Sequence, residues 1–387
     1  MSGSRTLAAE SVCTGNPHKV ADALADAVLD TILERDRFAR VNCKVLVSTG
    51  LVMLAGEVTC ETWVDVNAVV RKRLREIGYD EPGTGFDAGS CAIMNILEEQ
   101  SEELGLAVDR RGAGDQGTAV GYATDEGESL PGKTALMPAP VFYAHQLARH
   151  LCHARAEGRV QGLRPDGKVL LSVRYADDRP AHLDTVVVFA QHRDPAALPE
   201  LQARLRREVV EPALAQSGLL SGDSRVLINP AGPFTRGGPP VDAGFTGMLT
   251  AVDAYGPAAR QSSGCFSGKD PTKPDRSGSY LARHLAKNLV AAGLARRCEV
   301  SLTYVTGQEQ PILLQVDEFG TGKLPPERLE TLLRDHCDLG IPAIIENFDL
   351  RRPIYSPLSC FGQFGRPEAE APWERLSLVE ALARSAR

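Results

Sequence analysis

The stretch from residue 228 to residue 276 reads INPAGPFTRGGPPVDAGFTGMLTAVDAYGPAARQSSGCFSGKDPTKPDR, and the regular elements of the chain lie on either side of it. It is rich in glycine and proline and has no long apolar run. Glycine costs backbone entropy and proline removes a hydrogen-bond donor, so the stretch fits neither a core helix nor a central strand. Long irregular segments are uncommon in compact proteins and usually carry function. We therefore expect the functional site at this stretch, which is called the 228–276 segment below.

The segment ends in closely spaced charges of both signs, just before a predicted helix. These charges belong to Lys269, Asp270, Lys273, Asp275 and Arg276. Such a mixture beside a helix start suits a polyanion, a metal ion or a zwitterion. The alternative is a surface loop whose charges are only solvated, but long solvated loops are usually rich in serine and glutamate.

Composition excludes several classes of protein. The chain has 387 residues, enough for two or three domains with a sizeable core. Its net charge of -7 and the lack of a Lys/Arg cluster argue against nucleic acid and anionic membranes as partners. No apolar run reaches membrane-spanning length, and the nine cysteines form no C-x-x-C pair. We therefore expect a cytoplasmic protein with reduced thiols.

A pattern of helix, two strands and helix occurs three times along the chain. Asn16 and Pro17 suit the N-cap and first position of the first helix. Apolar spacing predicts these elements, in chain order, at 17–36, 43–49, 51–59 and 62–77, then 141–156, 169–175, 185–191 and 197–215, then 277–295, 299–306, 312–318 and 326–335. We expect an α/β (α+β) fold of three similar units, each a mixed or antiparallel sheet with helices on one face.

Two short motifs resemble nucleotide-binding signatures but lack their context. Residues 112–117, GAGDQG, fit G-x-G-x-x-G, yet a strand-like run follows them where a dinucleotide site needs a helix. Residues 264–269, GCFSGK, are one residue short of a P-loop and are followed by an aspartate. We reject both interpretations, although a backbone nest that binds anions stays possible at the second motif.

Several longer motifs together carry a resemblance over nearly the whole chain. They are ESV at 10–12, GNPHKVAD at 15–22, GAGDQG at 112–117, GYATDE at 121–126, RPDGK at 164–168, INP at 228–230, GGP at 237–239, FSGKDPTKPDR at 266–276 and NLVAAGLA at 288–295. On these residues the chain resembles the S-adenosylmethionine synthetase (methionine adenosyltransferase) family. The match continues in register to PIY at 353–355 and FGR at 364–366.

The resemblance implies three pseudo-symmetric domains, which we place at 1–110, 111–232 and 233–387. It also implies a homodimer or homotetramer with active sites at the subunit interface. The family joins ATP and methionine by attack of the sulfur on C5′ and then hydrolyses the triphosphate, with Mg²⁺ and K⁺ assisting. It implies no organic cofactor.

Carried over residue by residue, the methionine and adenosine ends of this site are retained. The positions that hold the amino acid are Glu57, Gln100, Asp242 and Lys273. The positions at the adenosine and phosphate part are Asp115, Asp166, Lys168, Phe234 and Lys269, with Lys19 also retained. The resemblance makes Glu10 and Asp275 candidate Mg²⁺ ligands.

The phosphate end departs from the family pattern. Asn16 replaces a histidine that contacts the triphosphate, and His18 replaces an aspartate that binds Mg²⁺. Pro233 replaces an arginine, and Met248-Leu249 replaces an Arg-Lys pair. Lys44 replaces the glutamate that binds K⁺, so its ammonium is expected to take the place of the cation. The missing cations make Mg²⁺ binding doubtful and should nearly abolish ATP chemistry, because one charged donor is typically worth roughly 10²–10³ in rate.

Each of these changes also has a structural interpretation. Asn16 is a good helix cap, His18 suits an exposed first turn and Met248-Leu249 suits ordinary packing. The loop between Gln100 and Gly112, which gates the site in the family, is shorter by a few residues. The changes all fall on one half of the expected pocket, which argues against random drift.

Three hypotheses of function remain open at this point. The favoured hypothesis is an enzyme that acts on S-adenosylmethionine itself, a lyase or cyclase that splits or cyclises the aminobutyryl group and releases methylthioadenosine. His18 would be its acid or base, with Asn16 orienting the substrate beside Lys19. The second is a working methionine adenosyltransferase with compensating cations such as Lys44, Arg236 or Arg260. The third is a non-catalytic regulatory subunit.

Overall fold

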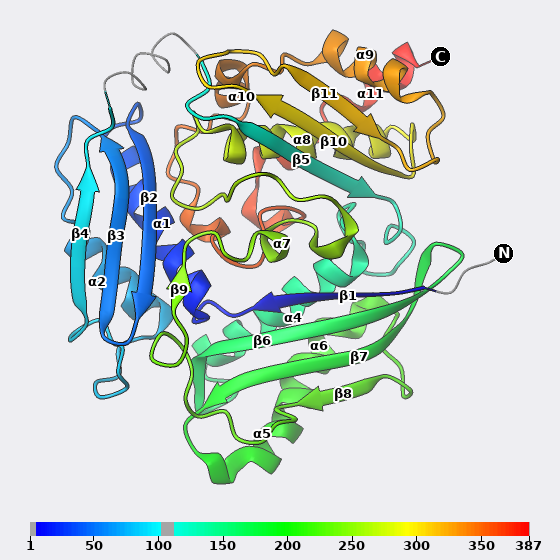
Figure 1. Ribbon diagram of the computed structural model, residues 1–387. Coiled ribbons are helices and arrows are strands. Elements are labelled where there is room, and N and C mark those ends of the chain that lie inside the picture. Colours follow the sequence, from blue (N-terminus) through cyan, green and yellow to red (C-terminus); the bar gives the residue numbers. More distant parts are fainter. Residues whose placement is uncertain (1–4, 102–111, 387) are drawn as a thin grey trace.

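Three β-sheets with helices packed on them organise the computed structural model, which describes residues 5–101 and 112–386 (Figure 1). The expected α/β fold with three similar units is confirmed. No helix among these residues is long and apolar enough to span a bilayer.

The first sheet holds the order β4-β3-β2-β9, and only β3 and β4 run parallel. Its strands and helices are β2 (Arg40–Ser48), β3 (Leu51–Thr59), β4 (Ala92–Glu98), β9 (Gly244–Phe245), α1 (Pro17–Leu33) and α2 (Val66–Ile77). Residues of β2 alternate strictly between buried and half-buried, because one face packs on α1. The other face, which carries Asn42, Lys44 and Leu46, has no helix or strand of the described residues across it in Figure 1. It is called the open face below.

The second sheet holds the order β1-β6-β7-β8, with α4 packed against β1 and β6. Its elements are β1 (Arg5–Val12), β6 (Leu163–Ala176), β7 (Arg179–His192), β8 (Arg225–Ile228), α4 (Ala139–Ala156), α5 (Leu198–Leu205) and α6 (Glu211–Leu214). The single helix expected at 197–215 is divided by one π-helical turn, Arg206–Val210.

The third sheet holds the order β11-β10-β5, and the buried helix α8 lies against β5 and β10. Its elements are β5 (Gly117–Thr124), β10 (Arg297–Tyr304), β11 (Leu313–Asp317), α8 (Pro274–Ala291), α9 (Pro326–His336), α10 (Ile341–Asn347) and α11 (Val379–Ser385). Strand β5 directly follows the GAGDQG motif, so the rejection of a dinucleotide site there is confirmed.

Three strands pair in a different sheet from the strands that are next to them in the sequence. Strand β1 precedes the first sheet in sequence but pairs with β6, and β5 precedes the second sheet's strands but pairs with β10. Strand β9, inside the 228–276 segment, pairs with β2. These exchanges tie the three sheets together around that segment. The domain boundaries placed between residues 110 and 111 and between residues 232 and 233 stay predictions.

Candidate functional site

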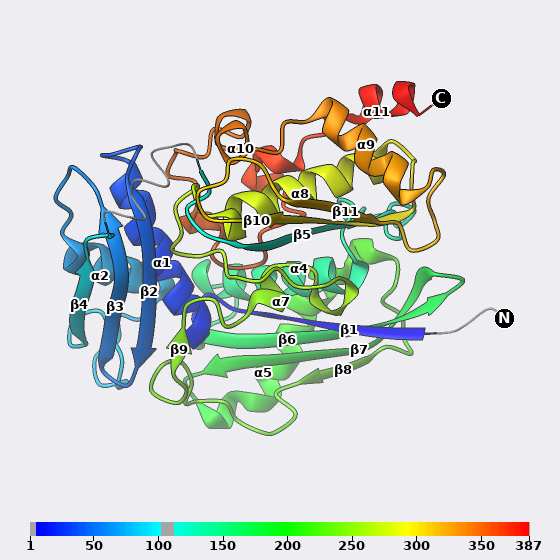
Figure 2. The ribbon, with the colours of Figure 1, turned by 45° about the horizontal axis from the view of Figure 1, so that its top comes forward.

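The 228–276 segment runs between the three sheets, and Figure 2 shows β9 and the short helix α7 (Thr250–Asp253) along this course. Its last part lies along the edge of β2. The amide of Cys43 donates to the carbonyl of Gly268 at 2.8 Å, and the amide of Asp270 donates to Val41 at 3.0 Å. The segment therefore continues the first sheet beside β2. Lys269 lies within this paired stretch, and Lys273 follows it.

A buried ion pair holds this part of the segment in place. Both oxygens of Asp26, on α1, accept from the guanidinium of Arg276, at 2.9 and 2.8 Å. The same carboxylate accepts from the amide of Gly268 at 2.8 Å, and Arg276 also donates to the carbonyl of Lys269. Neither side chain has exposed surface. The pair fixes the backbone on both sides of Lys269.

Lys273 is a buried cation without a hydrogen-bond partner among the described residues. Its side chain is 3% exposed, and its nearest carboxylate, Asp270, lies 3.8 Å away. A β-carbon at Gly114 would lie 3.0 Å from the Lys273 Nζ, so a glycine there leaves the ammonium uncovered. A buried ammonium that lacks a full partner is costly unless a ligand supplies one.

The amino-acid positions of the first sheet lie near its open face. Glu57 on β3 is directly opposite Asn42 on β2, and Asn42 forms a β-bridge with Lys269. The Asn42 Oδ1 and the Gln100 Oε1 are buried without hydrogen-bond partners in the described structure. These oxygens are free to accept from a ligand donor.

The adenosine positions come together where the second sheet meets the segment. The Asp166 Oδ2 accepts from the amide of Gly238 at 2.8 Å, and a β-carbon at Gly237 would contact both Asp166 and the ring of Phe234. Burial raises the pKa of Asp166 to about 6, although the amides of Gly238 and Gly167 oppose the shift. The charge of the exposed Asp242 raises this pKa further.

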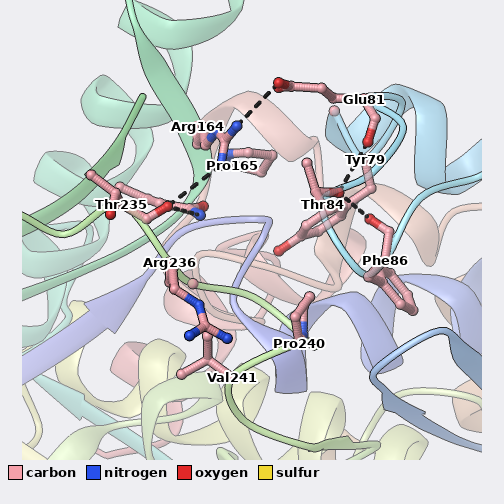
Figure 3. Close-up of a pocket in the computed structure, with 13 residues that line it drawn as sticks. Tyr79, Glu81, Thr84, Phe86, Arg164, Pro165, Thr235, Arg236, Pro240 and Val241 are labelled. Carbon is pink, nitrogen blue, oxygen red and sulfur yellow. Dashed lines mark hydrogen bonds and ion pairs between the residues drawn. The ribbon is translucent and has the colours of Figure 1, made fainter. Parts of the chain in front are cut away.

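A pocket adjoins these residues, and Figure 3 shows its lining. It is open to solvent and lies between the loop 78–86, the start of β6 and residues 235–241. Arg164 pairs with Glu81 at 3.1 Å and also donates to the carbonyl of Thr235. Arg236 lines the pocket and makes no hydrogen bond or ion pair within the described residues. Asp166 and Phe234 border the pocket but do not line it.

Two retained carboxylates carry lysine partners. Glu10 pairs with Lys168 at 2.7 Å, which joins the neighbouring strands β1 and β6. Asp275 pairs with Lys269, and both side chains are less than 9% exposed. Asp115 is half-buried, and its carboxylate accepts only from the amide of Gln116, at 2.8 Å, in the described structure.

Asn16 and His18 lie at the start of α1. The Asn16 Oδ1 caps the helix by accepting from the amide of His18 at 3.2 Å. The His18 Nδ1 accepts from the amide of Phe245 at 3.2 Å. A nitrogen that accepts is unprotonated, so the neutral ring carries its proton on Nε2. Both side chains are half-buried and engaged in local structure.

Lys19 is part of a buried network. Its ammonium donates to Asp22 at 2.8 Å and pairs with Asp253, and all three side chains are buried. Burial acts to lower the pKa of Lys19, but the two carboxylates outweigh it and raise the pKa. Asp22 also accepts from the amide of Gly247. In this structure Lys19 therefore connects α1 to the segment rather than facing a ligand.

Lys44 lies on the open face beside a thiol. Its Nζ is 3.1 Å from the Sγ of Cys265, and both residues are half-buried. No carboxylate pairs with Lys44 among the described residues. The expectation that this ammonium takes the place of a monovalent cation stays a prediction.

A Mg²⁺ site at the candidate carboxylates would need substrate oxygens to complete it. No group of three or more Asp, Glu, His or Cys side chains that could hold a metal ion occurs among residues 5–101 and 112–386. Mg²⁺ is commonly bound by one or two carboxylates together with phosphates and waters, and Asp275 and Glu10 can supply such carboxylates. An all-protein cage is excluded for the described residues.

Two of the residues that depart from the family pattern at the phosphate end, Met248 and Leu249, lie just before α7. Met248 is 61% exposed and Leu249 is half-buried just before α7. Of the compensating cations, Arg260 pairs with Glu299 and Asp317 at 3.0 and 2.9 Å, so it is not free for phosphate. The loop between Gln100 and Gly112 falls largely outside the described residues.

Sequence reasoning missed Asn42, Cys265 and the pair of Asp26 with Arg276. Asn42 was missed because the predicted strand began at residue 43, whereas β2 begins at Arg40, which puts Asn42 and Lys44 on one face. The contacts of Cys265 and Asp26 join residues more than 200 positions apart, so spacing could not reveal them.

Comparison with known proteins covers almost the entire chain. Three family models match: S-adenosylmethionine synthetase N-terminal domain at residues 4–102, central domain at 110–234 and C-terminal domain at 236–375. An S-adenosylmethionine synthase of Desulforudis audaxviator is 48% identical, covering 96% of each chain. An S-adenosylmethionine synthase of Thermus thermophilus is 46% identical, covering 99% of this chain and 98% of the relative.

Proposed function

Because the chain belongs to the S-adenosylmethionine synthetase family, we propose that it joins ATP and L-methionine to form S-adenosylmethionine, releasing phosphate and diphosphate. The observation that carries the proposal is the buried Lys273, whose ammonium lacks a hydrogen-bond partner in the described structure. A methionine carboxylate supplies the missing anion.

The amino acid would be held by groups of opposite sign. The carboxylate of methionine pairs with Lys273, and its ammonium pairs with Glu57 and Asp242. Charge-assisted hydrogen bonds of this kind are about twice as strong as neutral ones. The free oxygen of Gln100 is a further acceptor for the ammonium.

The adenosine would lie between Phe234 and Asp166. The Phe234 ring offers a stacking surface, and the ionised Asp166 accepts from ribose hydroxyls. We assign Lys168 and Asp115 to the same part of the substrate as further polar groups. Binding both substrates at fixed positions brings the sulfur to C5′.

The chemical step asks little of acids and bases. The thioether sulfur is a neutral nucleophile, so no proton needs to be removed, and positioning can supply a large part of the rate. The leaving triphosphate needs positive charge, which Lys269 supplies and which Arg236 can supplement from the pocket rim. Bound through Asp275 and Glu10, Mg²⁺ would add further charge at the leaving group.

Lys44 would replace K⁺. Its ammonium has no carboxylate partner in the described structure, and it lies two residues from Asn42 on the same face of β2. We expect activity that does not depend on K⁺, measured by exchanging K⁺ for Na⁺ at constant ionic strength. Lys44→Glu should make the rate K⁺-dependent; a wild-type rate that falls severalfold in Na⁺ would contradict this role.

A second copy of the chain would complete the site. No hydrogen bond or ion pair within the described residues joins Glu57 or Gln100 to Asp166 or Phe234. The open face also exposes large apolar side chains, Met94 at 47%, Ile96 at 50% and Phe245 at 42%. We propose a homodimer, or a tetramer built from it, in which open faces meet.

The hypothesis of a lyase or cyclase acting on S-adenosylmethionine gains no support from the comparisons, since the named relatives are synthases. A regulatory subunit without catalysis gains none either. Met248 is exposed where the family has a cation, and Arg260 is paired with acidic side chains, so neither offers free positive charge to a triphosphate. The experiment therefore includes both reactions.

The test supplies ATP, methionine and Mg²⁺ in one reaction and S-adenosylmethionine alone in another. Mass spectrometry follows S-adenosylmethionine formation in the first and methylthioadenosine release in the second. The proposal expects catalytic turnover in the first only, and loss of that turnover in Lys269→Met. Methylthioadenosine release that depends on His18, or no turnover in either reaction, would refute it.

A further inference from the structure

The contact between Lys44 and Cys265 joins a nucleophilic amine and a thiol at the candidate site. The Nζ and Sγ atoms are 3.1 Å apart, although the residues are separated by 221 positions. Cys265 is one of the three cysteines that are half-buried rather than buried. The remaining half-buried cysteines, Cys60 and Cys337, donate to backbone carbonyls and have no lysine contact among the described residues.

Local packing keeps the pair together. A β-carbon at Gly247 would lie 2.3 Å from the Cys265 β-carbon, so the glycine lets the turn after β9 close over the cysteine. Three residues after Cys265, Gly268 is hydrogen-bonded to Cys43, the neighbour of Lys44. No carboxylate in the described structure pairs with the amine or turns it away from the sulfur.

We propose that Lys44 and Cys265 form a reversible covalent bond, a sulfenamide, when the protein meets hydrogen peroxide. In the first step the Cys265 sulfur attacks peroxide, the O–O bond breaks, and a sulfenic acid and one water form. In the second step the Lys44 ammonium gives up one proton, the resulting amine attacks that sulfur and the S–OH bond breaks. The amine proton leaves with the hydroxide as a second water, so sulfur is oxidised by two electrons and peroxide is reduced by two.

The bond would change the site directly. It ties β2 to the residue that precedes Phe266-Ser267-Gly268-Lys269, and it removes the free ammonium of Lys44. Lys269 and Asp275 follow within ten residues, so the linkage constrains the backbone that presents them. Thiols restore the starting state, because a thiolate attacks the sulfenamide sulfur and releases the amine.

The experiment treats the full-length protein with hydrogen peroxide and measures the intact mass and the tryptic peptides. We expect a loss of about 2 Da, because two hydrogens leave when the S–N bond forms. Trypsin should no longer cleave after Lys44, and the peptides of Lys44 and Cys265 should appear as one cross-linked species. Dithiothreitol should reverse both changes.

Matched variants separate this bond from general oxidation. Lys44→Arg keeps the positive charge but removes the nucleophilic amine, and Cys265→Ser removes the sulfur, so neither should cross-link. Cys337→Ser should cross-link like the wild type. Irreversible gain of about 32 Da on Cys265 without a cross-link, or a linkage heavier by about 14 Da that retains oxygen, would overturn the sulfenamide.

Discussion

At the residue scale, Lys273 carries the functional argument. It is a cation that folding has buried without a hydrogen bond in the described structure, with Asp270 at 3.8 Å. Lys273→Met should raise the KM for methionine about 10- to 100-fold, because a charge-assisted hydrogen bond is worth roughly 1.5–3 kcal/mol. The free energy of unfolding should stay equal or rise, because the variant no longer buries a charge.

The control for this variant is Lys133→Met, at an exposed lysine. It should leave both the methionine KM and the stability unchanged. A Lys273 variant that loses stability while its KM stays at the wild-type value would show that the ammonium serves the fold alone.

Asp166 predicts a pH dependence. Burial raises its pKa from 3.8 to about 6, so the side chain loses its charge as the pH falls through that value. The ionised form accepts from ribose hydroxyls, so the KM for ATP should rise below about pH 6. Asp166→Asn should bind ATP weakly at every pH and lose this dependence between pH 5 and 8.

The same shift has a consequence for stability. The folded state binds the proton more tightly than the unfolded state, so the contribution of this group to stability is lost as the pH rises from about 4 to 6. At neutral pH the ionised, buried carboxylate therefore destabilises the folded state. A wild-type KM for ATP that stays constant from pH 8 to pH 5 would argue that Asp166 does not touch the nucleotide.

Sequence predicted some of these residues well and others poorly. In the structure Asp166 lies next to Phe234 and Lys269 pairs with Asp275, while the assignment of these residues to a substrate or metal stays a prediction. Lys19 was expected beside His18 and Asn16 as a catalytic residue, and in the structure its ammonium pairs with Asp22 and Asp253. Its partner Asp253 is 234 positions away, and no local pattern indicates such a contact.

At the element scale, the pair of Asp26 and Arg276 fixes the segment that presents Lys269. Asp26→Ala should lower the free energy of unfolding by about 3–5 kcal/mol, because it leaves a buried guanidinium without its anion. Urea unfolding measures this change. The control is Asp349→Ala, which breaks the exposed pairs with Arg37 and Arg352 and should cost at most about 1 kcal/mol for each pair.

Equal costs for the two variants would mean that the buried pair does not hold the segment.

Element positions were largely predictable, because periodicity and capping are local. The first helix was expected at 17–36 and is found at Pro17–Leu33. The exchange of β1, β5 and β9 between sheets was not predictable, because strand order depends on contacts between distant parts of the chain.

At the scale of the whole molecule, the proposed dimer makes the open face part of the active site. Ile96→Glu places a charge at an apolar position of β4 that is 50% exposed, and it should give a monomer that loses roughly 100-fold in activity. Light scattering after gel filtration measures the mass. Ile312→Glu, at a position 66% exposed in the third domain, is the control and should remain a fully active dimer.

A monomeric Ile96→Glu variant with wild-type activity would show that one chain carries a complete site.

The three-domain architecture itself followed from the threefold repeat of elements in the sequence. The contact surface did not, because half-exposed apolar residues on a strand are equally common in surfaces that never meet a partner.

The central claim is that one pocket holds methionine at Lys273 and the adenosine of ATP at Asp166 and Phe234. A crystal structure with methionine and a non-hydrolysable ATP analogue tests it most directly. The account predicts the amino-acid carboxylate within hydrogen-bond distance of the Lys273 Nζ, the ribose on Asp166 and the triphosphate beside Lys269. A nucleotide bound elsewhere, or a Lys273 that stays without a ligand while both substrates are ordered, would contradict it.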